Sequence, residues 1–215
     1  MNAVVVGDGE PGARDARHLA DADLIVAADG GAGWLAVQGF TPHVVVGDLD
    51  SIAVGLLDAL EADGVTIERH PADKDQSDAE LAVARAVASG ARRVIVLGAL
   101  GGQRLDHELS NLLMLTDPAW SSVDLRIVRD DTSVRALSDG GRLVLDGAYG
   151  DIVTLLPIGD ADGVTTDGLA YPLAGDTLRM GQSRGLSNVI ASTSASVRLQ
   201  AGTLLVVELK QRGLR

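Results

Sequence analysis

The sequence predicts an α/β protein: an N-terminal, mainly parallel α/β sheet domain followed by a smaller C-terminal all-β sandwich domain. Up to about residue 130, short β-branched runs alternate regularly with Ala- and Leu-rich segments of helical spacing, a pattern typical of a parallel sheet covered by helices on both faces. Beyond that point, short alternating runs are separated by Gly and Asp turns, as in antiparallel sandwiches. We therefore expect two domains, residues 1–130 and 131–215.

Each apolar run of the N-terminal part is predicted as a buried strand because it is short and β-branched. The expected strands are residues 3–6, 24–28, 44–46, 65–69, 94–97 and 125–128. The segments between them, predicted as helices, are residues 14–20, 34–38, 54–62, 78–89 and 106–115. In the C-terminal part the expected strands are residues 134–137, 142–145, 152–156, 196–199 and 204–209. The strand order cannot be derived from this pattern.

Composition restricts the classes of function. There are 18 Lys and Arg against 30 Asp and Glu, a net charge of −12, which disfavours nucleic acid or an anionic membrane as a partner. Aromatic residues are only 2% of the chain, so the core must be aliphatic, and there is no cysteine for disulfides or thiolate metal sites. No basic leader and no run of membrane-spanning length is present, so we expect a cytoplasmic soluble protein.

The segment Gly47-Asp48-Leu49-Asp50-Ser51 directly follows an expected strand, where open α/β sheets hold their ligands. In an extended segment Asp48 and Asp50 would face one target while Leu49 packs inward. Two such carboxylates suit Mg²⁺, which binds through carboxylates together with substrate phosphates. The alternative is that these residues only form a turn and a helix cap at Ser51.

Other strand ends carry similar chemistry. Asp29 and two glycines follow the second expected strand, where they either approach a ligand or simply begin a helix. In residues 73–80, Ser77 and Glu80 fit a capping box, but Lys74 among acidic residues suggests a polyanion held by metal and ammonium together, unless the loop is only a solvated charge run. Together these loops predict a site for a Mg²⁺-nucleotide.

The loop after the fifth expected strand, residues 98–107, is glycine-rich and contains Arg104, which can bind phosphate oxygens with two parallel hydrogen bonds. Asp106 begins the following helix, and Asn111 lies more than one turn further on. The earlier loop, residues 7–12, is also glycine-rich but lacks a phosphate-binding lysine. A lone His107 is usually a surface residue, and no catalytic role is assigned to it.

The ordered set of motifs resembles the thiamine pyrophosphokinase family. It consists of ADGGA (28–32), GDLDS (47–51), DKDQSDAE (73–80), GG-x-R-x-DH (101–107) with Asn111, and GLSN (185–188). The resemblance implies a nucleotide-binding α/β domain, a thiamine-binding β-sandwich, and a homodimer with active sites at the subunit interface. It also implies that the pyrophosphoryl group of Mg-ATP passes to the hydroxyl of thiamine, giving thiamine diphosphate and AMP.

The same resemblance implies roles for individual residues. Asp48, Asp50 and Asp78 would bind Mg²⁺, with Asp29 nearby. Asp75 or Asp29 could accept the proton of the hydroxyl. Nucleotide and phosphate positions fall on Lys74, Ser77, Arg104, Asp106 and Asn111, and the thiamine-side motif contains Ser187 and Asn188.

Two departures and two alternatives accompany this interpretation. Gln103 makes the arginine loop one residue longer than is usual in the family. The resemblance also implies a C-terminal tryptophan that stacks on thiamine, but no tryptophan follows Trp120. Tyr149 and Tyr171 are the remaining candidates, although a packed hairpin position is expected for Tyr171. The chain could instead be a pyrophosphokinase for another alcohol such as a hydroxymethylpterin, or a non-catalytic nucleotide- or thiamine-binding regulator.

Overall fold

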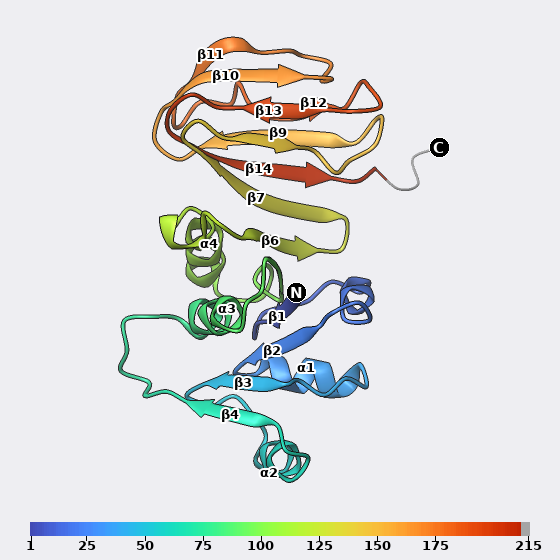
Figure 1. The fold of residues 1–215 in the computed structure, drawn as a ribbon, viewed down its shortest axis with the longest axis vertical. Coiled ribbons are helices and arrows are strands. Elements are labelled where there is room, and N and C mark those ends of the chain that lie inside the picture. Colours follow the sequence, from blue (N-terminus) through green and yellow to red (C-terminus); the bar gives the residue numbers. More distant parts are fainter. Residues whose placement is uncertain (212–215) are drawn as a thin grey trace. The chain divides into compact units, whose positions relative to one another are not determined.

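The structure is a computed structural model that describes residues 1–211 and divides into two compact units, Met1–Asp130 and the chain from Asp131 onward. Each unit is described by itself. The first unit contains, in chain order, β1 (Asn2–Val6), η1 (Asp15–His18), β2 (Leu24–Ala28), α1 (Gly31–Val37), β3 (Val44–Gly47), α2 (Val54–Ala62), β4 (Thr66–Arg69), α3 (Asp78–Ala88), β5 (Arg93–Leu97), α4 (Leu105–Met114), η2 (Pro118–Trp120) and β6 (Asp124–Arg129) (Figure 1).

The sheet of the first unit is parallel, with strand order β6-β5-β1-β2-β3-β4. Alternate residues of β1 point to opposite faces. Val4 and Val6 belong to a core cluster that also holds Leu35 of α1 and Leu60 of α2, whereas α3 contacts β1, β2, β3 and β5. Figure 1 shows α3 and α4 on the other side of these strands from α1. The expectation of helices on both faces is confirmed.

The first connection differs from its prediction. Helical spacing predicted a helix over residues 14–20, but only a short 3₁₀ helix, Asp15–His18, forms there. The reason is the fully buried Asp15 carboxylate, which accepts hydrogen bonds from the backbone N–H groups of Gly12 at 2.6 Å and Asp130 at 2.7 Å. These contacts tie the start of the segment to the end of the unit and shorten the helix.

The second unit contains β7 (Thr132–Ser138), β8 (Arg142–Val144), β9 (Ile152–Pro157), β10 (Ala161–Asp167), β11 (Ala174–Leu178), β12 (Asn188–Val189), β13 (Ser196–Arg198) and β14 (Thr203–Leu209). They form two antiparallel sets, β12-β9-β14-β7 and β11-β10-β13-β8. Val153 and Leu204 from the first set share one aliphatic core with Val164 and Val197 from the second. The unit is therefore a β-sandwich, and the predicted fold class is confirmed.

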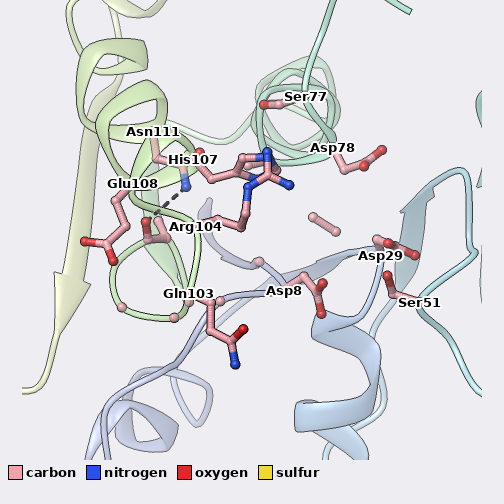
Figure 2. Close-up of a pocket in the computed structure, with 18 of the residues that line it drawn as sticks. Asp8, Asp29, Ser51, Ser77, Asp78, Gln103, Arg104, His107, Glu108 and Asn111 are labelled. Atoms are coloured by element: carbon pink, nitrogen blue, oxygen red, sulfur yellow. Dashed lines mark hydrogen bonds between the residues drawn. The ribbon is translucent and has the colours of Figure 1, made fainter. Parts of the chain in front are cut away.

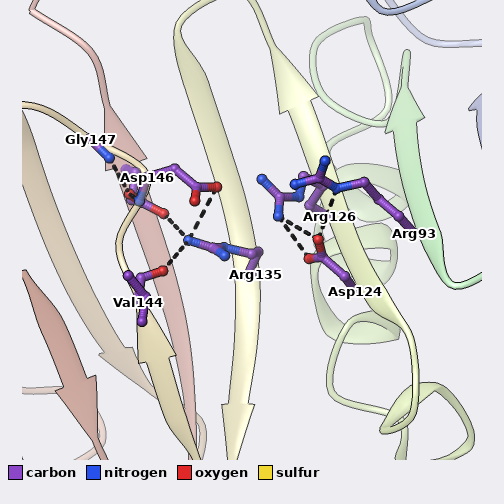
Figure 3. Close-up of polar contacts among 8 residues, drawn as sticks. Arg93, Asp124, Arg126, Arg135, Val144, Asp146 and Gly147 are labelled. Carbon is purple, nitrogen blue, oxygen red and sulfur yellow. Dashed lines mark hydrogen bonds and ion pairs between the residues drawn. The ribbon is translucent and has the colours of Figure 1, made fainter. Parts of the chain in front are cut away.

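Each unit contains a cluster in which a buried charged group is paired with an opposite charge of the same unit (Figure 3). In the second unit, the nearly buried Arg135 guanidinium pairs with the buried Glu208. Glu208 also accepts hydrogen bonds from the backbone N–H groups of Asp146 at 2.7 Å and Gly147 at 3.0 Å. Because a buried charge is tolerated only when it is paired and hydrogen-bonded, this network fixes the turn that follows β8.

In the first unit the corresponding cluster lies at β5 and β6. The Asp124 carboxylate accepts from Arg93 at 3.0 Å and from Arg126 at 2.6 Å. Burial alone would raise the pKa of Asp124, but the hydrogen bonds and charges of Arg126 and Arg93 lower it by more, so the pKa lies below its usual value. Within residues 1–211, no helix is long and apolar enough to cross a bilayer.

Substituting the buried Asp15 with Ala leaves one buried backbone N–H group, of Gly12, and one half-buried N–H group, of Asp130, without acceptors. Because each unsatisfied buried group costs free energy, Asp15→Ala should lower the free energy of unfolding by about 3 kcal/mol. Urea denaturation followed by circular dichroism measures this loss. The matched control is Asp21→Ala at an exposed neighbouring position, which should change stability by less than about 0.5 kcal/mol. Equal effects of the two substitutions would contradict the role given to Asp15.

Candidate functional site

The strand order creates a crevice beside β1. The chain passes from β1 to β2, β3 and β4 on one side, and then returns to place β5 and β6 on the other side. Ligands of open α/β sheets bind at such a reversal, outside the carboxyl ends of the strands. A cavity of about 500 Å³ lies there, lined by the loops after β1, β2, β3 and β5 and by the first turns of α3 and α4 (Figure 2).

Three carboxylates from separate loops meet in this cavity. One oxygen from each of Asp29, Asp48 and Asp78 lies within 4.8 Å of the other two. Asp29 follows β2, Asp48 follows β3 and Asp78 is the first residue of α3. Within residues 1–211, nothing donates a hydrogen bond to the buried Asp29 Oδ1. An all-oxygen donor set with an unsatisfied buried oxygen fits a hard divalent cation such as Mg²⁺.

Asp50 takes a different place from the one predicted. The extended geometry assumed for residues 48–50 is wrong, because Leu49 has a left-handed backbone with φ 68°. Leu49 is buried as expected, and Asp48 joins the carboxylate cluster. Asp50 lines the cavity but is exposed, and its carboxylate accepts a hydrogen bond from Ser51 Oγ at 3.1 Å. Its assignment as a metal ligand stays a prediction.

Two glycines permit this crowding of acidic side chains. At Gly47, with φ 147°, an added Cβ would lie 3.1 Å from Asp78 Oδ1 and 3.2 Å from Asp29 Cβ. At Gly30 it would lie 1.8 Å from Asp8 Oδ1. Any larger residue at these two positions would push the carboxylates apart, which gives a steric reason for the glycines in the motifs.

Burial and repulsion raise the pKa values of two carboxyl groups in the cavity. Asp29 is 6% exposed, and desolvation is the main cause of its raised pKa, with Asp48 and Asp8 adding repulsion and Ser51 partly offsetting it. The pKa of Asp8 is raised first by burial and then by the charges of Asp50 and Asp78. Negative charge therefore accumulates here at a cost to stability that a bound cation would relieve.

The predicted lysine lies beside the cluster. The Lys74 ammonium forms an ion pair with Asp78 Oδ1 at 3.1 Å and donates to the Pro71 carbonyl at 3.2 Å. Ser77 lines the cavity and caps α3, accepting a hydrogen bond from the Glu80 N–H at 3.2 Å. Asp75 is exposed and is not among the residues that line the cavity. Of the two candidate proton acceptors, the structure brings only Asp29 to the carboxylate cluster.

The loop after β5 supplies the cationic side of the site. Despite the additional Gln103, Arg104 lines the cavity. Its guanidinium donates two hydrogen bonds to Asp106, at 2.9 and 2.6 Å, and this pairing lowers the pKa of Asp106. Asp106 is thus placed to orient Arg104. Asn111 also lines the cavity, and its amide donates to the Ala99 carbonyl at 3.0 Å, supporting the glycine-rich loop.

Sequence reasoning missed Asp8, His107 and Glu108 as lining residues. All three line the cavity, and His107 is near enough to Asp8 to lower the pKa of that carboxyl group. Asp8 was visible in the glycine-rich loop after the first strand, but only the pairing of β1 with β2, and of β2 with β3, brings it to the other acids. The cavity therefore holds six carboxylates and one guanidinium.

The last two predicted residues belong to the second unit. Ser187 has φ 55°, and its backbone N–H donates to Thr154 Oγ1 at 3.0 Å. Asn188 is buried, and its side-chain amide hydrogen-bonds both the N–H and the carbonyl of Tyr171, at 3.0 and 2.7 Å. The expectation of a packed Tyr171 is wrong, because its side chain is 70% exposed.

Two family models together match most of the chain. The model described as "Thiamin pyrophosphokinase, catalytic domain" matches residues 16–129, which include the three-carboxylate cluster. The chain belongs to the thiamin pyrophosphokinase family. A second model, "Thiamin pyrophosphokinase, vitamin B1 binding domain", matches residues 142–204. The resemblance inferred from the motifs is therefore confirmed.

Individual members of the thiamin pyrophosphokinase family agree with this assignment. The chain is 28% identical over 187 residues to thiamine pyrophosphokinase 2 of Arabidopsis thaliana, covering 81% of this chain and 68% of that protein. It is 23% identical over 185 residues to thiamine pyrophosphokinase of Bacillus subtilis, covering 86% of each.

Solved structures establish the same fold. The crystal structure of thiamine pyrophosphokinase from Bacillus subtilis superimposes with a TM-score of 0.85 at 21% identity, covering 98% of this chain and all of that one. Thiamin pyrophosphokinase from Candida albicans gives a TM-score of 0.81 at 18% identity, covering 97% of this chain and 89% of that one.

Removing the charge of Asp29 tests the electrostatics of the cluster. A raised carboxyl pKa means that the ionised form is disfavoured by folding, so the cost is present at neutral pH and disappears as pH falls through the folded-state pKa. In EDTA, Asp29→Asn should therefore raise Tm by about 2 °C. Added MgCl₂ should stabilise the unchanged protein and stabilise this variant much less.

The control is Asp58→Asn, at an exposed position on α2. This variant should have the same Tm in EDTA, and the same increase in Tm with MgCl₂, as the unchanged protein. Differential scanning calorimetry measures both quantities. An undiminished response of Asp29→Asn to MgCl₂ would show that Asp29 is not part of a cation site.

Proposed function

We propose that the protein is a thiamine pyrophosphokinase that transfers the pyrophosphoryl group of Mg-ATP to the hydroxyl of thiamine, giving thiamine diphosphate and AMP. The observation that carries this proposal is the cluster of Asp29, Asp48 and Asp78 at the strand-order reversal. A cavity with six carboxylates and one guanidinium would repel a triphosphate unless divalent cations lie between them. The family models add the substrate class.

In this proposal Asp48 and Asp78 hold Mg²⁺ together with Asp29. Asp50 lines the same cavity and would contact Mg²⁺ as a further ligand. When bound, the ion would neutralise phosphate charge, as divalent ions do in phosphoryl transfer. Lys74 limits the repulsion at Asp78 through its 3.1 Å ion pair. The chain's task is mainly positioning and charge stabilisation.

The remaining residues would bind and orient the nucleotide. Arg104, oriented by Asp106, would donate to phosphate oxygens, because a guanidinium held on one edge still offers donors on another. Asn111 holds the glycine-rich loop through Ala99, and Ser77 presents the first turn of α3 to the cavity, where backbone N–H groups favour an anion.

The transfer forms a bond between the thiamine hydroxyl oxygen and the β-phosphorus of ATP. The bond from that phosphorus to the α–β bridging oxygen breaks, and AMP leaves. The hydroxyl proton needs an acceptor, and of the two candidates only Asp29 lies in the carboxylate cluster.

The second unit would bind thiamine through the segment that contains Ser187 and Asn188. This part of the proposal rests on the match of residues 142–204 to the vitamin B1 binding domain. By family resemblance, the chain would act as a homodimer in the cytoplasm, with active sites at the subunit interface.

Asp48→Asn should lower turnover at least about a hundredfold, because the loss of an anionic ligand removes much of the charge stabilisation in the transition state. The measurement is AMP formation from Mg-ATP and thiamine, with circular dichroism to confirm folding. Asp58→Asn serves as the control and should keep full activity. Near-normal turnover of Asp48→Asn would show that the Asp48 carboxylate is not a ligand of the proposed metal ion.

A competition assay separates the proposal from its alternatives. With thiamine and a hydroxymethylpterin present at equal concentration, thiamine diphosphate should be the dominant product. Preferential pyrophosphorylation of the pterin would identify a different pyrophosphokinase. Binding of ATP and thiamine without AMP formation would identify a non-catalytic regulator.

A further inference from the structure

The loop after β5 carries Arg104, which the proposed function places against the phosphates, on a backbone with little stiffness of its own. Gly101 and Gly102, which both line the cavity, turn the chain with φ 82° and 100°. Glycine is the residue with the most conformational freedom to lose, and Gln103 lengthens the loop further. A guanidinium on such a loop meets a phosphate in one fixed place only if other parts of the chain hold the glycine corner.

The residues before the corner are held by two hydrogen bonds. The Gly9 N–H donates to the Gly98 carbonyl at 2.9 Å, and the Asn111 amide donates to the Ala99 carbonyl at 3.0 Å. A Cβ added at Gly9 would lie only 2.3 Å from the Gly98 oxygen. The loops after β1 and β5 therefore cross in close backbone contact just before the corner begins.

Arg129 supports the corner itself. It is the last residue of β6, which runs parallel to β5, so it emerges at the same edge of the sheet as the loop. A Cβ added at Gly101 would lie 2.2 Å from Arg129 Nη1 and 2.6 Å from its Cζ. The guanidinium thus occupies the space where a side chain at Gly101 would lie. At Gly102, by contrast, an added Cβ would meet no atom of residues 1–211 within 4 Å.

The same guanidinium also contacts the loop after β1. Its Nη2 donates to Glu10 Oε2 at 3.3 Å. The two side chains are 38% and 64% exposed, and an ion pair of this kind contributes little to stability. Arg129 is not among the residues that line the cavity. Its effect on a nucleotide would therefore pass through the two loops that it joins.

We propose that Arg129 is a positioning residue for the nucleotide: its guanidinium holds the Gly101 corner beside the loop after β1 and so fixes where Arg104 meets the phosphates. This inference rests on the proposed function, because it concerns the same ATP. A planar guanidinium can pack against a peptide and pair with a carboxylate at the same time. Holding the loop in advance lowers the entropy that binding must remove.

The first test replaces the guanidinium with an uncharged side chain of similar length. Arg129→Met should weaken the Kd for Mg-ATP in calorimetry, and lower kcat/KM for Mg-ATP, about tenfold, because a misplaced binding group loses much of its effect. The KM for thiamine should stay within about twofold of its original value, since a contact with one substrate has been altered.

Arg129→Lys and Arg92→Met accompany this variant. Lysine keeps the charge but lacks the flat guanidinium, so Arg129→Lys should recover only part of the loss. Arg92 is an exposed arginine directly before β5, at the opposite edge of the same sheet. Arg92→Met is the matched control and should bind Mg-ATP as the unchanged protein does.

The second test asks whether Arg129 acts through Arg104. Arg104→Ala alone should weaken Mg-ATP binding. Adding Arg129→Met to it should change the Kd by less than about a further twofold, because residues that act as a unit are not additive. A purely structural role for Arg129 predicts the full tenfold loss in both backgrounds, and that result overturns the inference.

A further variant covers a folding defect, which circular dichroism would detect. If Arg129→Met does not fold, Glu10→Ala leaves the arginine in place and removes its partner. Glu10→Ala should weaken Mg-ATP binding about threefold, the scale of an exposed ion pair. An unchanged Kd in a folded Glu10→Ala protein would then overturn the inference.

The outcomes separate this inference from the proposed function. If Arg129→Met binds and uses Mg-ATP as the unchanged protein does, and AMP still forms from ATP and thiamine, the inference is overturned and the function stands. If the unchanged protein binds Mg-ATP but forms no AMP, the proposed function fails, while the Kd values still decide the role of Arg129. If the unchanged protein does not bind Mg-ATP at all, both fail.

Discussion

Mutual repulsion among carboxylates is the constraint on which the rest of the first unit depends. Oxygen atoms of Asp29, Asp48 and Asp78 lie within 4.8 Å of one another, and burial raises the pKa of Asp29 further. Such an arrangement destabilises the folded chain unless a cation joins it. The parallel strands, with their largely aliphatic core, supply the rigidity that keeps these side chains together.

Unusual backbone conformations occur at the motif residues. Within residues 1–211, four non-glycine residues have positive φ: Asp29, Leu49, Asp130 and Ser187. Three of them lie in the motifs that carry the resemblance to the thiamin pyrophosphokinase family, and left-handed backbone at non-glycine residues is costly and concentrates at functional sites. At Leu49 the left-handed backbone buries the leucine and turns Asp48 toward the cluster.

In the second unit, a residue of the GLSN motif holds the backbone of its neighbours. Asn188 is buried and occupied by the peptide groups of its neighbours, while the side chain of Tyr171 remains exposed. The Glu208 and Arg135 pair plays a comparable structural part at the turn after β8. In both places a buried polar group sets the backbone that carries an exposed segment.

The sequence by itself determined the fold class, the family and most strand positions, because β-branched runs and glycine-acid loops are local signals. β2 and α2 have the predicted bounds. The sequence did not reveal β10, β11 and β12, because their Gly, Asp and Asn residues are typical of turns. Pairing with neighbouring strands stabilises these three segments as strands. Only the tertiary structure decided the strand order, the presence of Asp29 instead of Asp50 in the cluster with Asp48 and Asp78, the place of Asp8 and the clamp of Asn188 on Tyr171. These features join residues far apart in the chain, and no local pattern encodes distances of that kind.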